Sequence, residues 1–340
     1  MQTLSQQQLN RAVLARQLLL ERAPTPLPRA LERIAGIQAQ YAPSMYVGLW
    51  SRLENLHRDA LTQALERRSV IQATLMRSTI HLVSKADFWP LALATREARR
   101  AHWLRSMPDP PSAREMTAAA RKLRGALDGA MSRKEVEALL GKDVARAIGL
   151  WIDLVRVPPS GTWERRRADL YAAAEDWLGP PPEIEDAKAH LVRRYLAGFG
   201  PASRQDVVSF TGLLPADAGA VLDRLRLRRF RSEHGQELFD VPRAPLPDPD
   251  TPAPPRFLPT WDAILLVHAR RAGVLPEEHR PKVFSVRNPH SSPTFLVDGR
   301  VAGTWKHEKG AIRLEPFGRL DATARRELRS EADRLAEFHA

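Results

Sequence analysis

A recurring order of amphipathic helices followed by a short β-branched ribbon is the feature that most restricts how this chain can fold. In the first round, apolar residues at helical spacing predict a helix over residues 5–22 and a second helix that stops at Gly36. Asp59 can cap a third helix that runs through Arg67. Residues 70–84 are rich in β-branched side chains close to period two, which predicts a β-ribbon. Three helices followed by a ribbon is the order of a winged helix-turn-helix module.

The same order returns twice along the chain. A long basic helix over 86–105 closes the first round, and helices predicted over 113–127, 132–140 and 142–150 then precede an interrupted ribbon with a Pro-Pro-Ser-Gly turn. The third round has a helix over 185–197, a further helix in PADAGAVLDRLR and a hairpin with a His-Gly turn. This weak internal similarity predicts three winged-helix units in series.

Beyond the third hairpin the composition changes. Residues 242–255 are proline-rich and predict a linker with little regular structure. Strand patterns follow, with Asp298-Gly299 as a tight hairpin turn, and the chain closes with an amphipathic helix over about 321–338. We therefore expect a mainly α fold with β (α+β), in which three tandem winged helix-turn-helix modules precede a C-terminal β-rich subdomain. The expected boundaries are 1–108, 109–183 and 184–243 for the modules and 244–340 for the linker and subdomain.

The charge balance favours a polyanionic partner. Lys and Arg number 52 against 40 Asp and Glu, which gives a net charge of +12. Neutralising phosphates releases counterions, so a basic surface binds nucleic acid strongly. A GC-rich genome also enriches arginine without any function, and composition alone leaves both readings open.

Several kinds of chemistry are excluded by what the sequence lacks. The chain has no cysteine, which removes disulfides, thiolate metal sites and thiolate nucleophiles. It has no phosphate-binding loop, no dinucleotide fingerprint and no His-Glu-x-x-His helix, and its histidines are scattered. We therefore expect no metal and no cofactor. No apolar run reaches membrane-spanning length and no signal peptide is evident, so we expect a cytoplasmic protein that associates with the nucleoid through DNA and not with a membrane.

The triplet Gln38-Ala39-Gln40 falls just after a predicted helix end, where the chain should become extended. Side chains two residues apart in an extended segment project to the same side, so both amides can converge on one point. Such a pair can fix a water molecule by donating and accepting hydrogen bonds. Glutamines at a surface or helix cap are the commoner explanation of a triplet like this one.

The surrounding segments resemble the AlkZ-like (YcaQ-like) DNA glycosylases, a winged-helix family that unhooks interstrand crosslinks. The resemblance covers nearly the whole chain, and its blocks occur in the family's order. The resemblance implies three tandem winged helices followed by a β-rich C-terminal part. The matching blocks are LERIAGIQAQYAPSMYVGLWSRL and LMRSTIHLVS within residues 31–84, the PPSGTW ribbon, HLVRRYLAGFGPAS at 190–203, LPTWDAILLVHARR at 258–271 and LVDGRVAGTWK at 296–306.

The resemblance also implies an activity. The family uses a Gln-x-Gln or Gln-x-Asp motif to position the hydrolytic water, and here the motif falls on Gln38 and Gln40 as the catalytic pair. The expected activity is that of a monofunctional DNA glycosylase that acts on N7-alkylated purines in double-stranded DNA, including crosslinked bases. Because amides are weak bases, an enzyme with the Gln-x-Gln motif should favour cationic lesions over neutral ones. We expect a monomer.

The resemblance and the basic ribbons together indicate which residues face DNA, although a polar strand face or a solvated charge run explains several of them equally well. Two positions depart from the family: Ser78 replaces a commoner glycine, and Arg270 stands where an aspartate is usual. Trp305 is expected in the core. The candidate DNA-binding residues are Arg77, Thr79, His81, Trp163, Arg165, Arg166, His268, Arg271 and Lys306.

Two other classes of function remain open. Three winged helices and a net charge of +12 suit a non-catalytic transcriptional regulator as well as an enzyme. A genotoxin-resistance protein that sequesters an adduct would also need a basic DNA-binding surface. The Gln-x-Gln triplet is the sequence feature that separates these alternatives.

Overall fold

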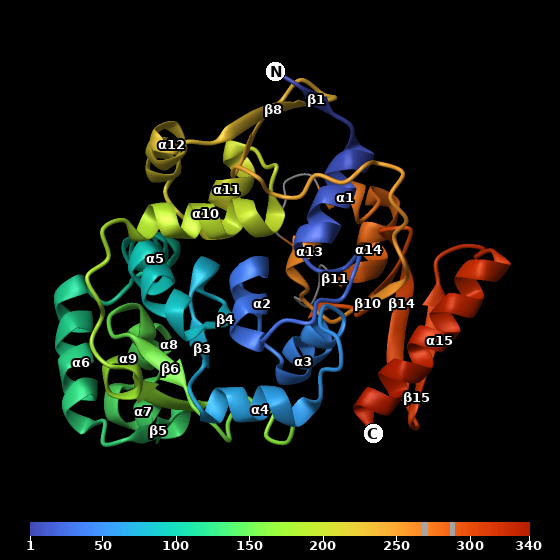
Figure 1. Cartoon of the computed structure of the whole chain (residues 1–340). Helices are drawn as coiled ribbons and strands as arrows, with labels where there is room; N and C mark the ends of the chain where they lie inside the picture. Colours follow the sequence, from blue (N-terminus) through green and yellow to red (C-terminus); the bar gives the residue numbers. More distant parts are fainter. Residues whose placement is uncertain (267–270, 286–289) are drawn as a thin grey trace.

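Helices and small sheets alternate along the whole chain, which gives the expected mixed α+β fold (Figure 1). The computed structural model describes residues 1–266, 271–285 and 290–340. Within these ranges, the helices are all too short or too polar to cross a membrane.

The first 106 residues hold one more helix than the sequence pattern predicted. The missed helix is α3 (Ala42–Trp50), and all nine of its residues are buried, so it has no polar face to give an amphipathic period. The first helix ends at Arg16, short of residue 22, because Leu18 takes a left-handed conformation with φ 57°. The elements of this segment are β1 (Thr3–Leu4), α1 (Gln6–Arg16), α2 (Leu27–Ile34), β2 (Ile37–Gln38), α3, α4 (Arg58–Glu66), β3 (Val70–Thr74), a 3₁₀ turn η1 (Met76–Ser78), β4 (Ile80–Ser84) and α5 (Lys85–Ser106).

A single antiparallel sheet joins the first two predicted modules. Its order is β2-β4-β3-β6-β7-β5, and β3 pairs directly with β6 through Gln72 opposite Arg156. The ribbons of the two predicted modules therefore lie side by side in one six-stranded sheet, in which β3 and β6 are the two central strands. The second segment consists of α6 (Ala113–Ala126), β5 (Ala130–Ser132), α7 (Arg133–Leu140), α8 (Lys142–Ala147), the 3₁₀ turn η2 (Ile148–Leu150), β6 (Leu154–Arg156), β7 (Leu170–Ala173) and α9 (Ala174–Leu178).

The third segment is organised around a central helix, α10 (Ala187–Phe199), which packs against α1, α2 and α5 (Figure 1). Its hairpin carries a third strand that comes from the other end of the chain, because β1 pairs in parallel with β8. No local pattern predicts this pairing. The remaining elements are α11 (Arg204–Thr211), α12 (Pro215–Arg224), β8 (Arg228–Ser232) and β9 (Glu237–Asp240).

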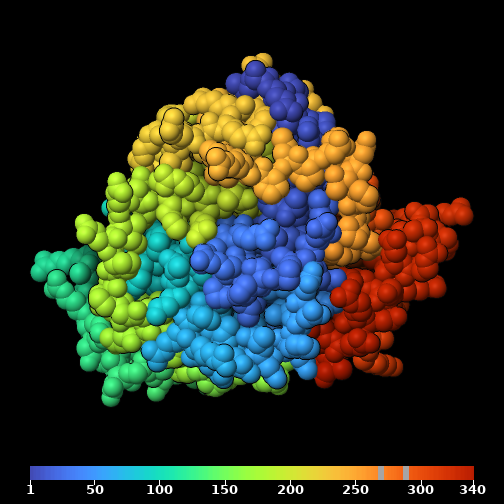
Figure 2. Space-filling view, in the orientation of Figure 1, coloured from blue at the N-terminus to red at the C-terminus, as the bar shows by residue number. Residues whose placement is uncertain are grey.

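The C-terminal part is built on a four-stranded antiparallel sheet, β10-β13-β14-β15. Asp298 and Gly299 connect β13 to β14 with φ 47° and 73°, which confirms the tight turn. In the space-filling view, the C-terminal helix stands at one side of the body and N-terminal segments fill the middle of the face (Figure 2). The elements are β10 (Arg256–Leu258), α13 (Ala263–Leu266), the 3₁₀ turns η3 (Arg271–Gly273) and η4 (Glu277–His279), α14 (Arg280–Val283), β11 (Phe284–Ser285), β12 (His290–Ser291), β13 (Thr294–Val297), β14 (Arg300–Glu308), β15 (Ala311–Pro316) and α15 (Ala322–His339).

Buried ion pairs connect the N-terminal helices to distant segments. Arg16 donates from Nη1 and Nη2 to the two carboxylate oxygens of Asp240 at 2.6 and 3.0 Å, and both side chains are almost wholly buried. Arg52 forms the same forked contact with Asp262 at 2.9 Å. Because breaking such a pair leaves a buried charge, these contacts fix how the C-terminal ends of α1 and α3 sit against the rest of the protein.

Candidate active site

A sharp reversal after α2 places Gln38 on the edge of the six-stranded sheet. Ala35 ends the helix in the left-handed region with φ 61°, and Gly36 follows with φ 76°. A Cβ on Gly36 would lie 2.9 Å from Val83 Cγ1, so only glycine fits this approach to β4. The chain then enters β2, where Gln38 pairs opposite His81.

The amides of Gln38 and Gln40 meet each other. Gln38 is 5% exposed and donates from Nε2 to Gln40 Oε1, whereas Gln40 itself is exposed. Backbone contacts of Ala39 hold the extended segment between them: its N–H donates to Ile80 O at 2.8 Å, and its carbonyl accepts from Gln72 Nε2 at 3.2 Å. The two side chains therefore converge, as the extended triplet predicted. We call them the Gln38–Gln40 pair.

Arg77 determines which way the Gln38 amide faces. Arg77 Nη2 lies 3.4 Å from Gln38 Oε1. A guanidinium only donates hydrogen bonds, so it requires the oxygen of Gln38 on its side. The nitrogen of Gln38 must then face Gln40, which accepts with its own oxygen. Gln40 Nε2 is left without a partner among the described residues, on the exposed side of the pair.

Arg77 is anchored to the third segment of the chain. Its Nη1 donates to Phe210 O, and its guanidinium lies 5.1 Å from the centre of the Phe210 ring. The backbone of Arg77 has φ 53°, and a Cβ on Gly212 would come within 3.3 Å of its nitrogen. Burial lowers the pKa of Arg77 to about 10, which leaves it charged at neutral pH. Its Nη1 and Nη2 are directed to Phe210 and Gln38, and the expected DNA contact of Arg77 stays a prediction.

His81 is a buried neutral residue beneath the same sheet edge. It is 2% exposed, and its Nδ1 lies 3.0 Å from Thr79 O, which requires the proton on Nδ1. Burial and the nearby charge of Arg77 lower the pKa of His81 to about 3. Thr79 donates from Oγ1 to Met76 O at 3.1 Å. These bonds shape the turn between β3 and β4, and the expected DNA contacts of Thr79 and His81 stay predictions.

A cleft of about 460 Å³ opens beside Gln40. Its walls come from the first sheet edge, α5, α7, α8 and the second ribbon. Arg156 projects from β6 into this region, donates to Thr74 Oγ1 at 3.0 Å and lies 5.2 Å from the centre of the Tyr171 ring. The sequence reading missed these residues; an arginine inside the short apolar strand LVRV was the available signal. Other polar or aromatic residues that line the cleft are Ser78, His102, Trp103, Ser106, Arg133 and Arg146.

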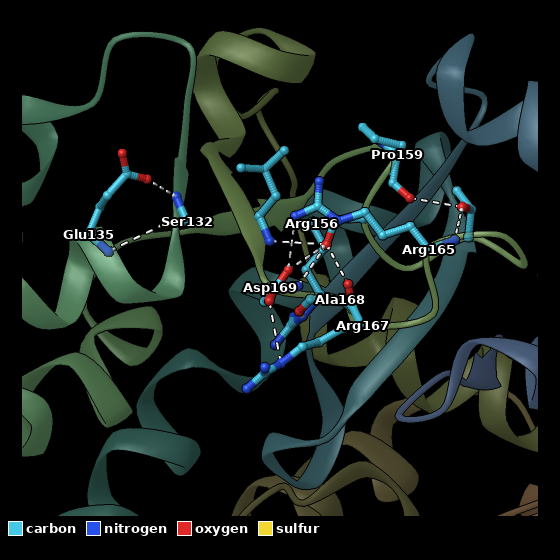
Figure 3. Close-up of polar contacts among 11 residues, drawn as sticks. Ser132, Glu135, Arg156, Pro159, Arg165, Arg167, Ala168 and Asp169 are labelled. Carbon is cyan, nitrogen blue, oxygen red and sulfur yellow. Dashed lines mark hydrogen bonds and ion pairs between the residues drawn. The ribbon is translucent and has the colours of Figure 1, made fainter.

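The loop between β6 and β7 carries three arginines, and hydrogen bonds of Ser160 within the loop hold its backbone. Ser160 Oγ donates to Arg167 O at 2.8 Å and accepts from Asp169 N at 2.7 Å. The Asp169 carboxylate lies 3.6 Å from Arg165 and 3.4 Å from Arg167, and Figure 3 draws Asp169 close to Arg167. Arg165, Arg166 and Arg167 are all exposed. They remain candidates for phosphate contact.

Trp163, on the same loop, lies in the core instead of on the surface. It is 7% exposed, and its ring packs 5.5 Å from Tyr46 and 5.9 Å from Phe338, centre to centre. The Arg58 guanidinium covers it at 5.0 Å. This ring anchors the loop between β6 and β7 to α3 and α15, and the expected DNA contact of Trp163 stays a prediction.

The remaining predicted residues come from the C-terminal part. Lys306 is exposed and pairs with Glu315 at 3.0 Å. Trp305 is 5% exposed and donates to Leu258 O, as expected for a core residue. His268 lies outside the described residues, and Arg271 is described only by its place at the start of η3.

Chemically, the Gln38–Gln40 pair offers an amide N–H donor and amide oxygens at the rim of an open cleft, with no titrating group of its own. Within residues 1–266, 271–285 and 290–340, no three His, Asp or Glu side chains gather as metal ligands do. The arrangement suits the orientation of one water molecule beside a substrate, which would be a passive but ordered contribution to hydrolysis.

Known proteins resemble this chain over almost its whole length. The family model "DNA glycosylase AlkZ-like" matches residues 31–338. A relative from Streptomyces sahachiroi described as an interstrand DNA cross-link repair glycosylase is 23% identical over 356 residues, which cover 94% of this chain and 93% of the relative. The solved structure of Streptomyces sahachiroi DNA glycosylase AlkZ has the same fold, with a TM-score of 0.81 at 19% identity over 98% of this chain and 97% of that chain. The chain belongs to the AlkZ-like DNA glycosylase family.

Proposed function

We propose that this protein is a monofunctional DNA glycosylase that hydrolyses the N-glycosidic bond of N7-alkylated purines. The observation that supports this most is the Gln38–Gln40 pair, whose amides converge at the rim of a basic cleft. A structural pair of glutamines would not need a dedicated arginine to set the amide of Gln38, as Arg77 does. We assign Gln38 and Gln40 the role of holding the attacking water.

The chemistry suits a pair of neutral amides. Alkylation at N7 gives the purine a positive charge, so the base leaves with the electrons of the C1′–N9 bond without prior protonation. Water forms the new C1′–O bond and releases a proton to solvent, and an abasic site remains. The enzyme has to supply an oriented nucleophile and electrostatic support near C1′, and oxygens of the Gln38–Gln40 pair can do both. We expect no covalent enzyme–DNA intermediate and no strand cleavage.

The substrate class extends to bulky and crosslinked purines. A crosslinked base cannot swing freely into an enclosed pocket, so unhooking requires a site that is open to the duplex. Gln40 is exposed and its cleft is open on one side, which supports this extension. The Streptomyces sahachiroi relative, named for interstrand crosslink repair, supports it as well.

Double-stranded DNA is the proposed partner, bound by three tandem winged-helix modules at 1–108, 109–183 and 184–243, with residues 244–340 as the β-rich subdomain. Each segment places helices before an antiparallel strand pair, which supports this division. The net charge of +12 supports binding to phosphates. Arg165, Arg166 and Lys306 are the proposed contacts, since their side chains are exposed.

A cleavage assay tests the activity. The protein is incubated with a duplex that holds one N7-methylguanine, and alkali then cuts any abasic site. The proposal predicts cleavage only after both treatments and free N7-methylguanine in solution. Binding of the duplex without base release would instead identify a non-catalytic DNA-binding protein. Protection of the adduct in proportion to the protein added, again without release, would identify a sequestering resistance protein.

A further inference from the structure

Tyr41 is an aromatic residue that the fold leaves exposed directly beside the Gln38–Gln40 pair. Among the described residues, the only large hydrophobic side chains classed as exposed are Tyr41, at 45%, and the terminal Met1, at 68%. The nearby Tyr46, five positions later, is fully buried with its hydroxyl bonded to Thr62, and Trp103 and Tyr171 of the adjoining cleft are only half-buried. An exposed ring at this position contributes no burial energy to folding, and exposed apolar groups often mark a binding surface.

The exposed ring is also braced. Tyr41 occupies the N-cap position of α3 with extended φ and ψ of −124° and 116°, yet its side chain makes no capping bond. Its hydroxyl accepts from Arg166 Nη1 at 3.2 Å, and Arg166 in turn donates to Trp163 O at 3.4 Å. Because α3 is wholly buried, the backbone beneath Tyr41 cannot shift easily. A braced ring loses less entropy when it is inserted into a partner than a free one does.

Tyr41 stands between two clefts. Gln40, its neighbour, lines the cleft of about 460 Å³ already described. Tyr41 lines a second one, of about 580 Å³, between the start of α3 and the C-terminal sheet. Basic side chains contribute to both, so a duplex can pass its backbone along either side of the ring. The cationic residues of the second cleft are Arg166, Lys282 and Lys306, and two glutamates, Glu308 and Glu315, line it as well.

We propose that Tyr41 stacks against the base next to the lesion and holds that step of the duplex open while the Gln38–Gln40 pair acts. The inference rests on the proposed glycosylase function. A base inside an intact stack hides its C1′ from a protein-held water, so an enzyme of this kind must separate or unstack the step. Side chains that enter between base steps are a known way to do so, and aromatic rings stack on any base.

Rates on paired and unpaired DNA test this role. In single-turnover base release from an N7-methylguanine duplex, Tyr41→Ala should be slower than the wild type by about tenfold, the scale of one lost base–aromatic stack. On the same strand without its complement, the loss should largely disappear, because no paired step has to be opened. Tyr41→Trp should restore release on the duplex. Glu164→Ala is the matched control, since Glu164 is an exposed acidic residue of the same loop that the proposal places neither in the site nor on DNA.

A second readout is independent of catalysis. A 2-aminopurine placed next to an abasic-site analogue should change its fluorescence when wild-type protein or Tyr41→Trp binds, and should not change with bound Tyr41→Ala. This response with a wild-type protein that releases no base would support the role of Tyr41 and sink the glycosylase proposal alone. Equal loss on paired and unpaired DNA, or a Tyr41→Ala variant as fast as the wild type on the duplex, would overturn the role of Tyr41.

Discussion

Arg77 Nη2 lies 3.4 Å from Gln38 Oε1, and through this contact the third segment of the chain reaches the amide pair in the first. The same guanidinium donates to Phe210 O on α11. Because a guanidinium only donates, this contact sets the oxygen and nitrogen of Gln38 relative to Gln40, and we propose that Arg77 is a positioning residue. The orientation of the pair therefore depends on how the segments pack.

Replacing Arg77 tests that dependence. Arg77→Met keeps an apolar stem against Phe210 but removes the donors, so Gln38 can rotate its amide. Hydrogen bonds to charged groups contribute about 1.5–3 kcal/mol, and a long one contributes less, so single-turnover base release should fall about tenfold with little change in DNA affinity. Arg121→Met, at an exposed site on α6, is the control. Equal rates for Arg77→Met and the wild type would mean that Arg77 does not position the amide.

Gly161→Ala should destabilise the protein at the junction of the two ribbons. Its Cβ would lie 2.2 Å from Gln72 Oε1, and Gln72 holds Ala39 between the two glutamines. Gly129→Ala is a matched control with a similar positive φ, 73° against 75°, but nothing near its Cβ. By urea unfolding, Gly161→Ala should lose about 1–3 kcal/mol more than the control. Equal losses would place the cost in the backbone alone.

His81 predicts a pH dependence of stability. Burial lowers its pKa from the ordinary histidine value of 6.5 to about 3, so between these values the unfolded chain binds a proton that the folded protein does not. Its contribution is therefore complete above about pH 6.5 and is lost as pH falls toward 3, with a slope of up to about 1.4 kcal/mol per pH unit. In His81→Gln, the free energy of unfolding should depend less on pH within this window. His234→Gln, at an exposed histidine, should leave this dependence unchanged.

The exposed arginines of the loop between β6 and β7 predict how DNA affinity depends on salt concentration. If Arg166 neutralises one phosphate, Arg166→Ala should reduce the slope of log affinity against log salt by about 1, and Arg165→Ala should do the same. Arg77→Met should leave the slope unchanged, because its guanidinium bonds within the protein. Binding titrations at several salt concentrations measure all three. An unaltered slope for both loop variants would remove this loop from the DNA surface.

Local patterns carried most of the secondary structure. The ribbon over 70–84 is confirmed as β3 and β4, and the helix predicted over 113–127 is confirmed as α6. The wholly buried α3 was missed because periodicity needs a polar face, and the pairing of β1 with β8 was missed because it joins residues more than 200 apart in sequence. Both failures concern information that a window of sequence does not contain.

In the candidate site, too, local sequence predicts some features, and packing between distant segments determines the others. Convergence of Gln38 and Gln40 follows from their spacing in an extended segment, and their contact confirms it. The burial of Arg77 and His81 does not follow from spacing, since it depends on α11 and on the sheet edge. Polar residues on a ribbon look alike in sequence whether they face solvent or another segment.

The most direct test of the account compares single-turnover base release by the wild type, Gln38→Ala, Gln40→Ala and the double variant on an N7-methylguanine duplex, with DNA affinity measured beside each rate. Two amides that hold one water act as a unit, so each single variant should fall to nearly the residual rate of the double variant while binding is retained. Wild-type rates in the double variant would contradict the central claim.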